Sequence, residues 1–150
     1  MIAYKVWNGC EVVAPGIQNF RSRIYMEDGV VTDEAYRSID FNQSTKHVVA
    51  INDDILNGRI VGCARLVMDK NIAVCSGVAV SKEKRSGIIW YRMMQKIMEL
   101  AKKSGAKELH GYSTERNSTA EMLERLGGRA VKVCFDKKYN CKMTLIVFVL

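Results

Sequence analysis

Long apolar runs are absent from this sequence, and so are the cysteine spacings of metal sites and disulfide frameworks. No apolar stretch reaches the roughly 20 residues that a membrane-spanning helix needs, and no signal-peptide pattern opens the chain. The five cysteines are odd in number and lack CxxC spacing, which favours reduced, buried thiols over disulfides or a zinc site. These absences predict a cytoplasmic protein with no membrane contact and no metal.

Proline is nearly absent too, with Pro15 alone, and no repeat, linker or low-complexity segment interrupts the 150 residues. That length suits a single domain spanning residues 1–150 with a core of its own. The net charge of +7 invites a nucleic-acid interpretation, because clustered Lys and Arg attract phosphate. Since the positive residues are spread along the chain, the sequence favours a solvated basic surface with one anion site over a nucleic-acid interface.

The central part of the sequence predicts a strand, a basic turn and a long helix. Residues 72–80 form a continuous apolar run rich in β-branched residues, which is typical of a strand buried on both faces. From Ile88 the apolar period becomes helical. The apolar stripe comprises Trp90, Met93, Met94, Ile97, Met98 and Ala101. The turn KEKRSG precedes this helix, and unpaired N–H groups at a helix N-terminus favour phosphate or pyrophosphate.

Hydrophobic periodicity also places elements on both sides of this centre. Strands are predicted at 2–7, 46–52, 59–68, 107–113, 130–135 and 142–149, helices at 17–28, 32–38 and 117–125, and a loop at 8–16. The central strand, helix and strand imply a right-handed parallel crossover, whereas the flanking hairpins are antiparallel. The predicted fold class is α/β (α+β), with a mixed, mostly antiparallel sheet of about seven strands flanked by helices.

The segment VAVSKEKRSGIIWYRMMQKIMELA resembles the acyl-coenzyme A signature of the GNAT superfamily of N-acetyltransferases. That signature is a valine strand, an Arg/Gln-x-x-Gly-x-Gly/Ala turn and a helix. GAKELHGYSTERNSTAEMLERLGG is similar to the family's second strand and helix. The resemblance implies a GNAT-like fold that binds acetyl-coenzyme A, or another acyl-coenzyme A, through the strand and the turn. The residues that it assigns to the cofactor are Val78, Ala79, Val80, Lys84, Arg85, Ser86, Gly87, Ile88, Ile89, Trp90 and Asn117.

The residues for proton transfer depart from the family's pattern. No carboxylate lies on the central strand, where many relatives carry a glutamate, and Leu123 stands at or next to the usual tyrosine. His110 and Tyr112 share one face of the strand at 107–113 by the period of two. This placement suits His110 as the base and Tyr112 as the acid. The alternative is that both are partly buried core residues with satisfied polar tips.

The N-terminal segment FRSRIYMED, followed by Asp40 and by HVVAINDDILNGRIVGCARL, is similar to the opening of GNAT relatives that make acyl-homoserine lactones or long-chain N-acyl amino acids. In those relatives Arg, an aromatic residue, Glu and Asp line the substrate pocket. The residues that this resemblance assigns to the substrate are Arg23, Tyr25, Glu27, Asp40 and Arg65. A carboxylate pair would recognise an ammonium group and an arginine a carboxylate. The alternative is a solvated helix face with an arginine at a strand edge.

Three functions agree with these patterns. The first is an N-acetyltransferase that moves acetyl from acetyl-coenzyme A to a primary amine of a small molecule or a protein, by direct attack. The second uses a longer acyl chain from coenzyme A or from an acyl carrier protein, whose acidic surface would suit this basic one. The third is a non-catalytic protein that binds acyl-coenzyme A or nucleic acid. The C-terminal hairpin either completes the monomer's sheet or swaps into a partner, so a homodimer stays an alternative.

Overall fold

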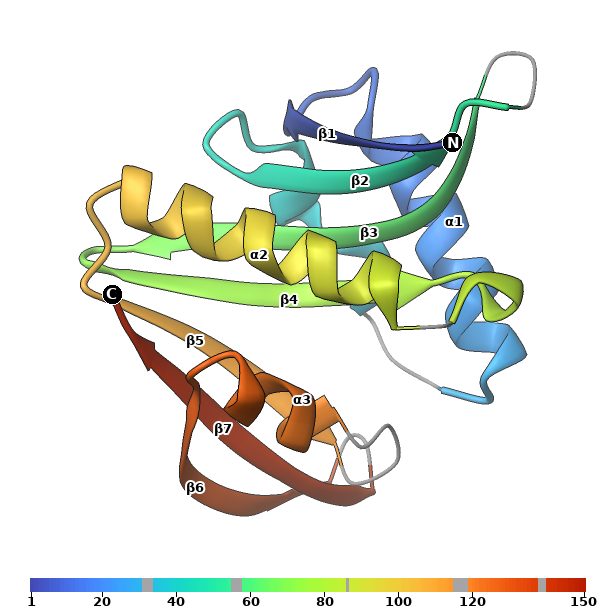
Figure 1. Ribbon diagram of the computed structural model, residues 1–150. Coiled ribbons are helices and arrows are strands. Elements are labelled where there is room, and N and C mark those ends of the chain that lie inside the picture. The colour runs from blue at the N-terminus through green and yellow to red at the C-terminus, as the bar shows by residue number, and fades with distance from the viewer. Residues whose placement is uncertain (31–33, 55–57, 86, 115–118, 138–139) are drawn as a thin grey trace.

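The computed structural model describes residues 1–30, 34–54, 58–85, 87–114, 119–137 and 140–150 (Figure 1). A sheet of seven strands has the order β1-β2-β3-β4-β5-β7-β6. Its strands are β1 Ile2–Asn8, β2 Lys46–Asn52, β3 Arg59–Asp69, β4 Ile72–Val80, β5 Glu108–Thr114, β6 Arg129–Asp136 and β7 Cys141–Val149. Neighbouring strands are antiparallel except β4 and β5. The mixed, mostly antiparallel sheet predicted from the sequence is confirmed.

Helices lie on both faces of this sheet (Figure 1). The α-helices are α1 Ala14–Glu27, α2 Ile88–Lys103 and α3 Thr119–Arg125, and short 3-10 helices are η1 Glu34–Tyr36, η2 Ser38–Phe41 and η3 Lys82–Lys84. Side chains of α2 and α3 share one apolar core, and α1 forms a second core against β2, β3 and β4. None of the helices in the described ranges is long and apolar enough to span a membrane.

The long helix α2 follows the predicted pattern. It begins after Gly87, whose φ of 91° lies in the left-handed region that glycine tolerates. The buried residues are Ile89, Met93, Met94, Ile97 and Ala101, with Trp90 and Met98 half-buried beside them. The opposite side is charged and exposed, so burial of one stripe against the sheet stabilises the helix.

Two local predictions near the N-terminus are wrong. The loop predicted at 8–16 ends early, because α1 already begins at Ala14. Pro15 lies in the first turn, where its missing N–H needs no intrahelical partner. Within the helix predicted at 32–38 the structure has only the short 3-10 helix η1, a second one, η2, begins at Ser38, and residues 31–33 lie outside the described part. Backbone carbonyls of Glu34 and Ala35 accept hydrogen bonds from Arg21, so a long-range contact takes groups that a helix would have used.

The parallel pair β4 and β5 is joined over only part of its length. Pairing runs from Ile72 opposite Glu108 to Cys75 opposite Gly111, although both strands continue. Just beyond that point, Gly77 and Val78 of β4 lie opposite the single β3 residue Ala64, which is a β-bulge. Gly77 has a φ of 61°, which favours glycine. The strands therefore separate beside a bulge, and this separation creates the site described next.

Candidate active site

A cavity of about 750 Å³ opens where β4 and β5 separate. Residues 74–80 of β4 form one wall and residues 109–112 of β5 form the other. The helices α1, α2 and α3 and the strand β7 contribute apolar side chains to the rest of the wall: Ile24, Met94, Met98, Met122, Leu123, Met143 and Phe148. This size and lining are typical of a site for a small-molecule ligand.

The basic turn closes one end of the cavity. Lys84, Arg85, Gly87 and Trp90 all line it. The guanidinium of Arg85 donates to both carboxylate oxygens of Asp28, at 3.1 and 2.8 Å, and its Nε donates to the Val80 carbonyl at 3.0 Å. Within the described residues, Lys84 makes no ion pair. Lys84 and the first amides of α2 are therefore the groups available to a phosphate, while Arg85 holds the turn against α1.

The other residues assigned to the cofactor have different positions. Val78, Ala79 and Val80 line the cavity, as the strand prediction requires. Ile89 is buried in the core, and Ile88 is exposed at the start of α2. Ser86 and Asn117 lie outside the described residues.

Side chains from α1 hold the bulge in β4. Arg21 is fully buried, and its Nε donates to the Gly77 carbonyl at 3.0 Å. Tyr25 donates from its hydroxyl to the Val78 carbonyl at 2.9 Å. A Cβ on Gly77 would lie only 3.0 Å from Arg21 Nε, so this close approach needs glycine. The backbone that faces the cavity is thus positioned by residues far away in the sequence.

A buried ionic network lies behind the bulge. Asp40 accepts hydrogen bonds from Arg21 and Arg65, both at 3.0 Å, and all three side chains are fully buried. Arg65 also bonds Ser76 of β4 and the carboxylate of Glu34. Burial opposes ionisation of Asp40, but the Arg21 charge and the hydrogen bonds that Asp40 accepts outweigh it and lower its pKa. The network supports β4 from within the protein.

The structure therefore separates the five residues assigned to the substrate. Tyr25 lines the cavity, and burial raises its pKa, so the phenol stays protonated. Asp40 and Arg65 belong to the buried network and are not part of the cavity wall. Arg23 and Glu27 pair with each other at 3.3 Å on the exposed side of α1. Only Tyr25 of this set is in a position to touch a ligand in the cavity.

The two proton-transfer candidates both line the cavity. His110 is 22% exposed, and its Nε2 lies 3.0 Å from Oε1 of Glu108. With Nε2 as the donor in this contact, Nδ1 carries the lone pair that can accept a proton. Tyr112 is 54% exposed on the same face of β5. Glu108 was missed by the sequence analysis, although it precedes His110 by two residues, the spacing that places side chains on one face of a strand.

Other cavity residues had no signal in the sequence. Glu34 reaches the wall from η1. Cys75 lies where the strands begin to separate, and burial raises its pKa to about 12. Burial therefore favours the thiol of Cys75 over the thiolate, which is the nucleophilic form. No group of three metal-ligating side chains occurs among the residues that the structure describes.

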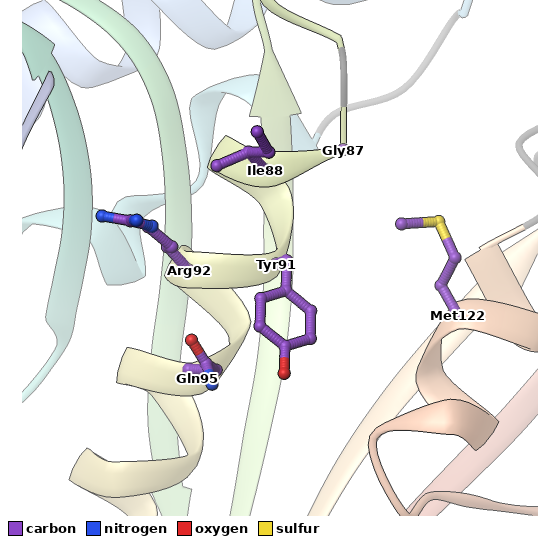
Figure 2. A pocket seen from close by; sticks show the side chains of 6 residues that line it. All are labelled: Gly87, Ile88, Tyr91, Arg92, Gln95 and Met122. Carbon is purple, nitrogen blue, oxygen red and sulfur yellow. The ribbon is translucent and has the colours of Figure 1, made fainter.

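A shallow depression adjoins the cavity between α2 and α3. Figure 2 shows Tyr91 of α2 and Met122 of α3 on opposite sides of it, with Arg92 pointing away from Met122. Gly87 and Met122 line both the depression and the large cavity. The depression and the cavity therefore lie next to each other beside the basic turn.

Comparison with solved structures finds proteins that share this architecture. The chain is similar to Escherichia coli ElaA (TM-score 0.81, 14% identity, 99% of each chain covered). It is also similar to an acyl-CoA N-acyltransferase from Pseudomonas aeruginosa (TM-score 0.82, 14% identity, 99% of this chain and 100% of the other). A third similar structure is aminoglycoside 6'-N-acetyltransferase complexed with coenzyme A (TM-score 0.74, 12% identity, 97% and 96%). At these identities the likeness shows the fold.

The family follows from the sequence itself. The profile of the acetyltransferase (GNAT) family matches residues 14–127, which include α1, the bulged strand β4, the basic turn, α2, β5 and α3. The chain belongs to the acetyltransferase (GNAT) family and is an acyltransferase. No curated protein sequence shows significant similarity to it. The resemblance noted in the sequence is confirmed at the level of the family.

Proposed function

We propose that this protein transfers an acetyl group from acetyl-coenzyme A to a primary amine by direct attack. The observation that supports this most is the separation of β4 from β5 next to a basic helix N-terminus. An open strand edge offers backbone hydrogen bonds to a pantetheine arm, and the turn offers amides and a lysine to a pyrophosphate. Membership of the family supports an enzyme over a non-catalytic binding protein.

In this proposal the cofactor lies along β4. The backbone of residues 78–80 would pair with the pantetheine, and Lys84 with the first turn of α2 would hold the pyrophosphate. Ser86 and Asn117 keep their assignment as expectations. Arg85 contributes by holding the turn to Asp28, and not by binding phosphate directly. The nucleotide end would leave through the depression beside Tyr91 and Met122.

The chemistry then needs one base and one acid. The amine nitrogen attacks the thioester carbonyl, a C–N bond forms and the C–S bond breaks. His110 accepts the proton from the amine at Nδ1, and Glu108 holds the ring through Nε2. The coenzyme A thiolate takes a proton from Tyr112 or from water. Backbone N–H groups of the open strand stabilise the developing oxyanion.

A longer acyl chain is the second candidate. The observation in its favour is the apolar wall made by Met94, Met98, Leu109 and Phe148, because flexible methionine side chains adapt to chains of different length. Either coenzyme A or an acyl carrier protein would deliver this chain. The acceptor is a small-molecule or protein amine in both cases.

Calorimetric titration separates these alternatives. We expect acetyl-coenzyme A to bind more tightly than a long-chain acyl-coenzyme A; the reverse order would favour the second candidate. Lys84→Ala should weaken binding about tenfold or more, because a charge-assisted contact to phosphate is lost. Lys103→Ala, at the exposed far end of α2, is the matched control and should bind normally. Equal affinities for both variants would refute the pyrophosphate site.

A further inference from the structure

The strand β6 is an exposed edge of the sheet. It pairs with β7 on one side, and among the described strands none pairs with its other side. Val131, Val133 and Phe135 are 59%, 61% and 59% exposed. An unpaired strand edge with large apolar side chains is a template for another strand. The unpaired side of β6 is therefore a surface on which a strand of another molecule can pair.

The sequence of β6 is complementary to itself. Placing a second copy antiparallel, with Cys134 on the two-fold axis, puts Val133 opposite Phe135 and Lys132 opposite Asp136. By symmetry each pair occurs twice. Apolar cross-strand pairs and opposite charges both stabilise an antiparallel ladder. Val133 and Phe135 alternate with the charged pair, so the apolar contacts gather on one face and the ionic contacts on the other.

The ionic pairs form in one register only. A bulge between Ala130 and Lys132 interrupts the regular strand at one end, and β6 ends at Asp136. The regular segment 132–136 is the self-complementary segment. A shift by two residues would bring Lys132 opposite Cys134 and lose both ionic pairs. The segment that can pair regularly is thus the same segment, 132–136, whose side chains are complementary.

We propose that two copies of this chain join through antiparallel pairing of β6 across a two-fold axis at Cys134. The contact is isologous, because each copy offers the same strand. It continues the sheet of one copy into that of the other. The partner is therefore a second copy of this chain. The interface lies at the outer edge of β6, and β7 separates it from the cavity wall β5.

Sedimentation velocity across a concentration series tests the proposal. The wild type should reach twice the monomer mass of 16.9 kDa. Lys132→Asp should return it to monomer, because it places like charges opposite each other at two positions. The double variant K132D/D136K exchanges the charges and should restore the dimer. The control Lys103→Asp, on α2, should remain dimeric, and thermal unfolding should show that every variant folds.

The cysteine on the axis supplies a second readout. Directly opposite residues of an antiparallel pair have Cα atoms about 4.5 to 5.5 Å apart, within the range of a disulfide. Oxygen with copper phenanthroline should oxidise two Cys134 thiols to one intermolecular disulfide. The link should form in the wild type and in Cys10→Ser, and fail in Cys134→Ser. A wild type that stays monomeric, or a dimer insensitive to Lys132→Asp and not linked through Cys134, would overturn the proposal.

Discussion

The two halves of the sheet are built differently. The strands β1 to β4 lie between α2 on one face and α1 on the other (Figure 1), and four successive residues of β2 are buried. In the other half, β6 is exposed along nearly all of its length, and the short helix α3 packs against β5, β6 and β7. The first half has the buried charges, and the second has the more exposed of the two edge strands.

This difference explains how a cavity forms between the halves. The wall at β4 is held from behind by the network of Asp40, Arg21 and Arg65, which reaches the bulge at Gly77. The wall at β5 has no equivalent buried network among the described residues. The β4 wall is therefore fixed by several long-range hydrogen bonds. The β5 wall lacks this support among the described residues and carries the proton-transfer candidates.

Among the changes considered, removing Asp40 should reduce the stability of the protein most. Asp40→Ala leaves the two buried arginines without their shared carboxylate, and we expect a loss of about 3 to 5 kcal/mol in the free energy of unfolding. Urea denaturation measures it. The control in the other half is Glu121→Ala, which breaks the exposed pair with Arg125 and should cost less than about 0.5 kcal/mol. Similar losses for both variants would remove the distinction between the halves.

An intermediate effect is expected at the bulge. Gly77→Ala adds a Cβ at a positive φ and against Arg21, so it should cost about 1 to 3 kcal/mol and weaken acetyl-coenzyme A binding. Gly105→Ala is the matched control, since Gly105 also has a positive φ but no atom within 4 Å of the added Cβ. It should cost stability without changing the affinity. Normal binding by Gly77→Ala would contradict the role given to the bulge.

The smallest effect is a pH dependence from the buried half. His47 is fully buried with its Nε2 2.9 Å from the Asp40 carbonyl, and burial lowers its pKa from 6.5. As the pH falls below 6.5, the unfolded chain takes up a proton that folded His47 does not, so stability falls. The slope should be at most about 1.4 kcal/mol per pH unit.

Urea denaturation from about pH 8 to about pH 5 gives this slope. His47→Gln should flatten the part of the curve just below pH 6.5 that His47 causes. The pKa of Asp40 is lowered from 3.8. Below about that pH the unfolded chain binds a proton that folded Asp40 does not, so Asp40 should add a further loss of stability only there. If stability instead rises as the pH falls from 7 to 5, His47 does not control the pH dependence of stability in this range.

Much of the fold could be predicted because its signals are local. The strand at 72–80 has its predicted bounds and the long helix begins at Ile88 as predicted, since periodicity and a glycine before the helix determine them. The 3-10 conformation of η1 could not be predicted, because Arg21, far away in the sequence, donates to the carbonyls of Glu34 and Ala35. For the site, the wall residues 78–80, Lys84, His110 and Tyr112 came from the sequence, whereas Glu34 and Glu108 did not.

The sequence by itself determined most of the strands and the long helix, the basic turn at a helix N-terminus and the family, because each depends on residues close together in the chain. Only the tertiary structure decided which charged residues are buried and which line the cavity. Asp40 and Arg65 have the same side-chain chemistry in either role, and contacts 19 to 25 residues apart place them inside. The insertion of β7 between β5 and β6 was also decided there, since a hairpin pairs its own strands in the same way whichever one lies next to β5.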